Sequence, residues 1–207
     1  MPEPLIVPMF YPPNSLRNWG KKDYSMLTSS TASDYLKAIL FDKVTKRCNG
    51  RRFFGEAYVA AKIEHRHGYY GSFKWVTNPR FSNYRPFPKG PTKQYKEELR
   101  TALFKHFGKR QIEKLQRHAM DITNATGVRP VATDLWLVDR QGNHRFIEVK
   151  LPNDRVRPQQ LKGMYLISSC LRVNTQLSVE IVELRPEHEL TSQKHTKNPK
   201  GGLTTSH

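Results

Sequence analysis

The stretch FIEVKLPNDRVRPQQ, residues 146–160, decides the fold, and it begins as a β-strand that ends in charged residues. Residues two apart in a strand point to the same face, so Phe146, Glu148 and Lys150 share one face of the sheet. A face that starts with an aromatic ring therefore ends with a carboxylate and an ammonium group. The Glu-x-Lys tripeptide by itself is common and would indicate only an ion pair in solvent at a strand end.

The preceding segment TDLWLVD, residues 133–139, predicts a partner strand, joined to the first by a turn that contains Gly142. In a three-residue hairpin loop glycine often takes the third, left-handed position, which makes residues 140–142 the loop. This register places Asp134 directly opposite Glu148, on the same face. A slip of one residue would put the two on opposite faces. The sequence therefore predicts two carboxylates at one end of a hairpin.

The same register predicts an aromatic pair, Trp136 and Phe146, behind the two carboxylates. Carboxylates at close range repel unless one takes up a proton or a cation lies between them. Oxygen ligands suit Mg²⁺ or Mn²⁺, and the backbone carbonyl of Val149 is a further candidate ligand. Glu56, in the apolar stripe of a helix expected within residues 50–66, is the candidate third carboxylate. A metal ion there can activate a water molecule, while Lys150 orients that water or neutralises developing charge.

The net charge of +17 is the largest compositional signal and favours a polyanionic partner. Nucleic acid is the first choice, because no single amphipathic basic helix carries the charge to a membrane surface. A merely solvated basic surface is the alternative. Candidate phosphate-binding residues flank the carboxylates or lie in a loop with interleaved aromatic residues, and they are Arg129, Arg155 and Arg157 in the first group and Arg80, Arg85 and Lys89 in the second.

The cysteine and histidine content argues against other kinds of site. Two cysteines, Cys48 and Cys170, form neither a disulfide framework nor a four-cysteine zinc site, and they indicate reduced thiols in the cytoplasm. His65 and His67 have no cysteine nearby, so a phosphate contact or an exposed helix end is favoured over zinc. No phosphate-cradling G-x-x-x-x-G-K segment occurs, which predicts no nucleotide cofactor. No apolar run approaches the roughly 18 residues that span a bilayer, and the N-terminus lacks the basic region of a signal peptide.

The combination of Asp134, Glu148-Val-Lys150 and the following PNDRVRPQQ resembles the PD-(D/E)XK nuclease superfamily, and within it the VRR-NUC nucleases most closely. Those typically show a Pro-Asp-Leu strand, a Glu-Val-Lys strand end and then a segment like G-P-x-D-R-L-S-P-x-Q. The resemblance covers about residues 127–184. Two positions depart from the pattern: Thr133 replaces the proline, and Leu151 stands where glycine is common.

The resemblance implies an α/β fold like that of restriction endonucleases, with a mixed central sheet flanked by helices. It implies that Asp134 and Glu148 bind metal, that Lys150 is the catalytic lysine and that Gln160 lies near the active site. Glu56 matches the glutamate of an early helix, with Glu98 as its competitor. It further implies a homodimer that cuts branched or other structured DNA with Mg²⁺ or Mn²⁺. A non-catalytic nucleic-acid-binding protein on the same scaffold and an RNase are the rival interpretations.

The chain is expected to divide into three parts. Residues 1–30, rich in proline, predict an extended arm. Residues 31–185 predict a single nuclease domain with a helical insertion, its core being about 127–184 together with the early helix at 50–66. Residues 186–207 are polar and predict a disordered tail.

Overall fold

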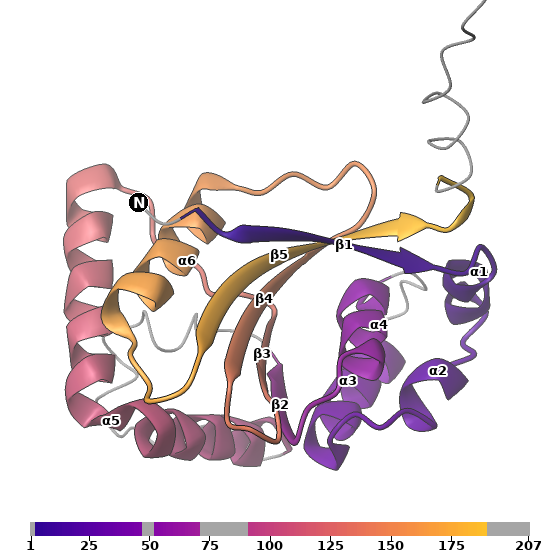
Figure 1. The fold of residues 1–207 in the computed structure, drawn as a ribbon, viewed down its shortest axis with the longest axis horizontal. Coiled ribbons are helices and arrows are strands. Elements are labelled where there is room, and N and C mark those ends of the chain that lie inside the picture. The colour runs from indigo at the N-terminus through magenta and orange to yellow at the C-terminus, as the bar shows by residue number, and fades with distance from the viewer. Residues whose placement is uncertain (1–2, 47–51, 71–90, 190–207) are drawn as a thin grey trace, which may run out of the picture.

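The computed structural model describes residues 3–46, 52–70 and 91–189, and within the last range the side chains from residue 97 onward. Five strands form one mixed sheet in the order β1-β5-β4-β3-β2 (Figure 1). The strands are β1 (Leu5–Tyr11), β2 (His67–Tyr70), β3 (Leu135–Val138), β4 (His144–Lys150) and β5 (Leu177–Pro186). The helices are α1 (Ser15–Gly20), α2 (Ser25–Thr28), α3 (Asp34–Lys46), α4 (Phe54–Lys62), α5 (Pro91–Thr126) and α6 (Pro158–Cys170).

The β3–β4 hairpin has the predicted register. Trp136 pairs with Phe146, and the backbone N–H of Asp139 donates to the carbonyl of Asn143 at 3.1 Å. Residues 140–142 are the loop, and Gly142 takes a φ of 81°, the left-handed conformation that glycine adopts without strain. β4 then pairs in parallel with β5, β5 in parallel with β1, and β3 antiparallel with β2.

Helices cover both faces of the sheet, α1–α4 on one side and α5 and α6 on the other (Figure 1). The alternation of each strand divides the core in two. Leu135 and Ile147 pack under α3 and α4, whereas Trp136 and Phe146 pack under α5 and α6. The Trp136 and Phe146 rings stack with centroids 5.7 Å apart. This is the α/β architecture that the sequence predicted.

The expectation of an extended arm over residues 1–30 is wrong. Residues 5–11 form β1 at the edge of the sheet, and the following two helices bury Trp19 and Leu27 in the core. The Tyr11 carbonyl accepts a hydrogen bond from the backbone N–H of Glu187, so the backbone groups of Tyr11 face β5. Backbone groups alternate in direction along a strand, so those of Pro8, three residues earlier, face away from β5. Proline is tolerated there because its lack of an N–H removes no hydrogen bond to β5.

The predicted helices are present. α6 begins at Pro158 as expected, and α5 is two helices joined at Gly108, where φ is 73° and ψ is 154°. The predicted strand over residues 69–77 is described only to Tyr70, and most of the predicted tail also lies outside the described residues. None of the helices in the described part of the chain is long and apolar enough to span a membrane.

Candidate active site

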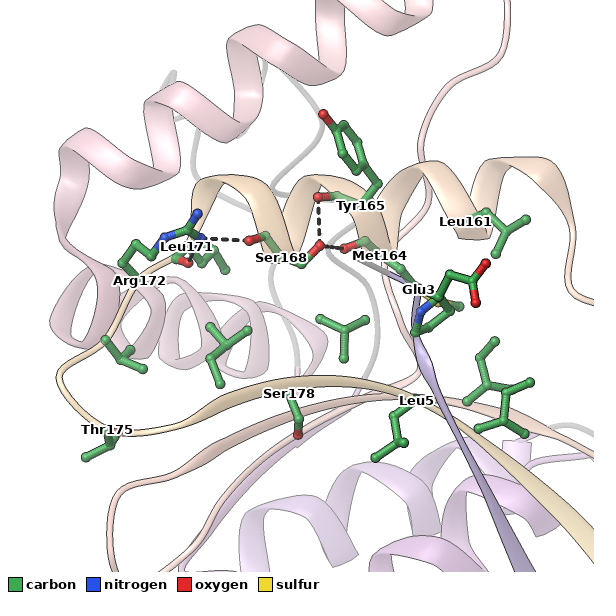
Figure 2. A pocket seen from close by; sticks show the side chains of 16 residues that line it. Glu3, Leu5, Leu161, Met164, Tyr165, Ser168, Leu171, Arg172, Thr175 and Ser178 are labelled. Carbon is green, nitrogen blue, oxygen red and sulfur yellow. Dashed lines mark hydrogen bonds between the residues drawn. The ribbon is translucent and has the colours of Figure 1, made fainter. Parts of the chain in front are cut away.

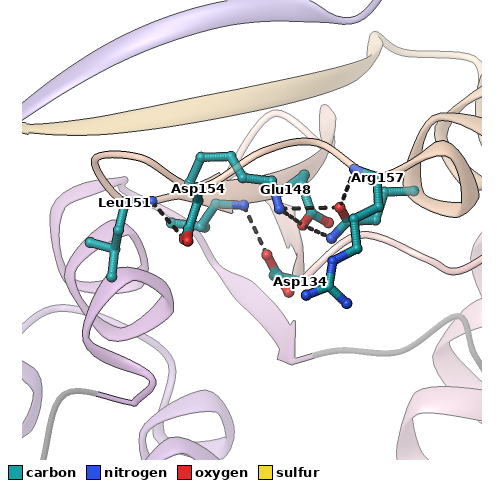
Figure 3. Close-up of polar contacts among 8 residues, drawn as sticks. Asp134, Glu148, Leu151, Asp154 and Arg157 are labelled. Atoms are coloured by element: carbon teal, nitrogen blue, oxygen red, sulfur yellow. Dashed lines mark hydrogen bonds and ion pairs between the residues drawn. The ribbon is translucent and has the colours of Figure 1, made fainter.

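The carboxyl groups of Asp134 and Glu148 meet at the open end of the β3–β4 hairpin (Figure 3). Asp134 lies directly before β3, and its Oδ2 accepts a hydrogen bond from the backbone N–H of Val149 at 2.9 Å. Glu148 is the third residue from the end of β4 and is only 1% exposed. The predicted pairing of the two carboxylates is therefore present in the structure.

Two side chains bind the same oxygen of Glu148. Lys150 Nζ donates to Oε1 at 2.7 Å, and Gln160 Nε2 donates to the same atom. Gln160 Oε1 in turn accepts from Lys150 Nζ at 3.2 Å and from the backbone N–H of Arg157 at 2.9 Å. Gln160 thus connects the first turn of α6 with both charged residues of β4.

The second oxygen of Glu148, Oε2, is buried and receives no hydrogen bond from any donor in the described residues. Asp134 interacts with Glu148, but two ionised carboxylates have no proton to share. A hydrogen bond between the two therefore requires that one of them be protonated. An added cation would remove that requirement.

Burial, with the adjacent Asp134 charge as the second cause, raises the pKa of Glu148 to about 8. Burial and the Asp134 charge likewise raise the pKa of Glu56 to about 7. Burial also raises the pKa of Asp134 itself. The site therefore resists carrying all of these negative charges when it holds no cation.

Glu56 approaches this pair from the first turn of α4. It lines the same cavity, about 460 Å³ in volume, as Asp134 and Glu148. The preceding Gly55 permits the close approach, because a Cβ there would lie 2.8 Å from Val149 Cγ1. Glu98 lines a different cavity, beside β2 and α5. The geometry therefore favours Glu56 over Glu98 as the early-helix glutamate.

The donor set at the hairpin end fits a hard divalent cation. Two adjacent carboxyl groups, one with a buried oxygen that has no donor within the described part of the chain, offer the oxygen ligands that such a cation takes. Within the described ranges, however, no three acidic, histidine or cysteine side chains are grouped closely enough to form a ready metal centre. Glu56 thus lines the same cavity as Asp134 and Glu148, but its carboxyl group is not close enough to the other two to form a three-ligand site. Val149, whose carbonyl is the remaining candidate ligand, also lines the cavity.

The segment between β4 and α6 closes into a tight turn around Asp154. The Leu151 N–H donates to Asp154 Oδ2 at 3.2 Å, and the Asp154 N–H donates to the Leu151 carbonyl at 3.0 Å (Figure 3). Asn153 takes a left-handed φ of 71°. A turn of this kind is typical of Pro-Asn-Asp directly after a strand.

The N-terminal half of α6 is fixed against the segment that leads into Asp134. A Cβ on Gly163 would lie 1.7 Å from the Val131 carbonyl oxygen, so only glycine fits. The Val131 N–H also donates to the Gln159 carbonyl at 2.9 Å. Gln160 and Asp134, which come from separate parts of the chain, are held in position by this crossing.

The basic candidates are distributed unevenly. Arg155 and Arg157 are exposed and line the cavity of the carboxylates. Arg129 is exposed too, but it does not line that cavity. The loop candidates lie outside the described residues, and they are Arg80, Arg85 and Lys89.

His65 has a structural role that the sequence did not reveal. It is buried, its Nδ1 contacts the Ile63 carbonyl at 2.7 Å, and its Nε2 accepts from the backbone N–H of Ser33 at 3.2 Å. Both ring nitrogens are thus used in joining the start of α3 to the end of α4. The expectation that His65 contacts phosphate or lies at an exposed helix end is therefore wrong, because its ring is buried and both of its nitrogens bind backbone groups.

A second and larger cavity, about 880 Å³, lies between α6, β5 and the start of β1 (Figure 2). Its walls are mainly apolar, with Leu5, Leu161 and Met164 among them. Glu3 is the one carboxylate among its lining residues. It therefore lacks the paired acidic groups found at the hairpin end.

Comparison with known proteins identifies one family. The model of the VRR-NUC domain matches residues 79–191, more than half of the chain and including both carboxylates, Lys150 and Gln160. No curated protein matches, and neither does any solved structure. The match, the mixed sheet and the hairpin site agree, and the chain belongs to the VRR-NUC family of PD-(D/E)XK-like nuclease domains.

Proposed function

We propose that this nuclease-family protein is a metal-dependent endonuclease that hydrolyses phosphodiester bonds in DNA, with branched or junction DNA as its preferred substrate. The observation that carries the proposal is the pairing of Asp134 with the buried Glu148, with Lys150 and Gln160 both bound to one Glu148 oxygen. Glu148 Oε2 is buried without a donor among the residues that the structure describes, which supports a role for this pair in cation binding.

In this proposal Asp134, Glu148 and the Val149 carbonyl hold Mg²⁺ or Mn²⁺, and Glu56 joins them directly or through water. A bound divalent ion of this kind polarises a phosphoryl oxygen and lowers the pKa of a water molecule. Arg155 and Arg157, at the rim of the cavity, bind the DNA backbone on either side of the reacting phosphate. Arg129 and the basic loop around Arg80, Arg85 and Lys89 would extend that contact.

Lys150 acts on the reacting groups themselves. Its side chain lines the cavity and is only 12% exposed, so its charge is weakly screened there. It can stabilise negative charge that develops on the phosphate oxygens or orient the attacking water. Gln160 accepts from Lys150 and donates to Glu148, so it is a positioning residue that holds both in one geometry.

The extent of the nuclease domain, the oligomeric state of the protein and its location in the cell can be proposed as well. Because β1 pairs with β5, we propose that the nuclease domain extends from β1 through β5. The family resemblance suggests a homodimer, which light scattering of the purified protein would test. The two cysteines suggest a reducing compartment, the cytoplasm of a prokaryote or of an infected host, and localisation by cell fractionation would test this.

A cleavage panel tests the function. The intact protein is incubated with plasmid, four-way junction, flap and single-stranded DNA and with structured RNA, in Mg²⁺, Mn²⁺ or EDTA. We expect metal-dependent cleavage of branched DNA, absent in EDTA and reduced by at least about 10³-fold in Lys150→Ala. The matched control is Lys162→Ala, on α6 outside the cavity, which should retain activity. DNA binding without cleavage under every condition would support the non-catalytic alternative, and cleavage confined to RNA would support an RNase.

A further inference from the structure

A separate cavity of about 450 Å³ lies between the edge strand β2, the start of α3 and the first half of α5. This volume is within the range of small-molecule sites, about 300–1,000 Å³. We call it the β2–α5 cavity, and no part of the proposed catalytic chemistry uses it. The side chains that define it are Tyr35, His67, Tyr69, Glu98, Lys105 and His106.

The interior of this cavity combines aromatic rings with a carboxylate. The Tyr35 and Tyr69 rings meet edge to face, with centroids 5.6 Å apart. Glu98 lines the same cavity as the two rings, and burial, followed by the negative charge of Glu98, raises the pKa of both tyrosines. One face of the Tyr69 ring stacks on Trp136, with centroids 4.6 Å apart. A flat ligand that donates N–H groups matches the combination of Tyr35, the rest of the Tyr69 ring and the carboxylate acceptor.

Neutral imidazoles and a cationic rim complete the cavity. Burial, followed by the charges of Arg66 and Lys105, lowers the pKa of His67, and burial followed by Lys105 lowers that of His106. Both rings are therefore neutral at pH 7 and can donate or accept a hydrogen bond. Lys105 and Arg66 are exposed cations beside them. A bare phosphate inside is disfavoured by Glu98, whereas a base inside with its phosphate at the rim satisfies both groups.

The position of the cavity relates it to the active site. Tyr69 pairs with Trp136, which lies two residues after Asp134 and points to the same face of the sheet. Along the strand direction this separation is roughly 7 Å. A nucleotide whose base entered the cavity would therefore lie within a few nucleotides of a phosphate at the hairpin end.

From this arrangement we propose that the β2–α5 cavity binds one unpaired nucleobase of the DNA substrate, with Tyr35 and Tyr69 as the aromatic wall and Glu98 accepting from the base. The proposal rests on the nuclease function proposed above and deepens it, because it makes an unpaired nucleotide near the cut part of what is recognised. Extruded bases are commonly read by stacking together with hydrogen bonds to their edges.

The test compares the binding of intact DNA strands with that of strands that lack one base. The Lys150→Ala protein in EDTA is titrated with short single-stranded DNA in which an abasic site replaces each nucleotide in turn. We expect one position at which the abasic site weakens binding by about tenfold. Glu98→Gln and Tyr35→Ala should abolish that preference, and Glu113→Gln, an equal charge change farther along α5, should preserve it.

Two results would overturn the inference. One is equal affinity for intact and abasic strands at every position, and the other is a base preference that Glu98→Gln and Glu113→Gln leave equally intact. Because binding is measured without metal and without Lys150, the outcome is independent of cleavage. A protein that cuts DNA but shows no base preference would refute this inference and leave the proposed function standing.

Discussion

Asp134 and Glu148 lie side by side at the end of one hairpin, yet the Asp134 oxygen Oδ2 accepts from the Val149 backbone while Glu148 Oε2 accepts from no donor in the described chain. Lys150 and Gln160 both bind the other Glu148 oxygen, Oε1, so the two carboxyl groups share the single ammonium group of Lys150. Glu56, which lines the same cavity, adds a third carboxyl group to this imbalance of charge.

Replacing Glu56 with glutamine should stabilise the metal-free protein at alkaline pH. Its folded pKa of about 7 lies above its ordinary value of 4.5, so its stabilising contribution is complete below pH 4.5 and is lost as the pH rises through 7. Glu56→Gln should therefore raise the free energy of unfolding at pH 8 by on the order of 1–3 kcal/mol. Urea unfolding in EDTA at pH 5 and pH 8 measures this, with the exposed Glu64→Gln as control. A gain that is equal at both pH values would contradict the prediction.

Gln160→Ala should slow cleavage by about 10–100-fold with little change in stability, because Lys150 and Glu148 lose a shared partner. The neighbouring Gln159→Ala is the matched control, since Gln159 contributes its backbone carbonyl to Val131. Single-turnover rates across pH separate a positioning role from a folding defect. Equal rates for the two variants would show that the Gln160 side chain has no such role.

Gly163→Ala should cost more than about 3 kcal/mol of stability or prevent folding, because the added methyl group would overlap the Val131 carbonyl oxygen. Ser169→Ala on the same helix should change stability little. Thermal unfolding of both variants gives the comparison. A Gly163→Ala protein as stable as the wild type would mean that α6 and the segment before Asp134 are not in close contact.

Trp19→Ala tests whether the first 30 residues belong to the domain. Trp19 is 1% exposed and its Nε1 donates to the Arg52 carbonyl at 3.1 Å, so its loss should cost about 3–5 kcal/mol. Arg17→Ala, an exposed change on the same short helix, should be nearly neutral. Denaturant unfolding distinguishes them. A neutral Trp19→Ala would restore the interpretation of this segment as an appended arm.

The sequence was most informative where local chemistry decides the structure. Gly142 set the hairpin loop, and with it the pairing of Asp134 with Glu148, while Pro158 and Gly108 marked helix boundaries. It misled where a local signal has two meanings. Pro8 suggested a non-regular arm, but a proline also suits a strand whose N–H faces a free edge.

Other features of the site depend on contacts between distant segments. Whether Glu56 or Glu98 reaches the carboxylate pair depends on the packing of α4 on β4, which Gly55 permits. The dual role of Gln160, in the first turn of α6 and on Glu148, likewise requires the crossing of α6 over the chain. Neither relationship leaves a periodic pattern in the sequence.

The most direct test of the central claim is calorimetric titration of Mn²⁺ into the intact protein and into Asp134→Asn, with Asp121→Asn on the exposed side of α5 as control. We expect the wild type and Asp121→Asn to bind Mn²⁺ at one site that is lost, or weakened by at least about 10-fold, in Asp134→Asn. Equal Mn²⁺ binding by all three proteins, or none by the wild type, would contradict the assignment of the hairpin end as a metal-dependent nuclease site.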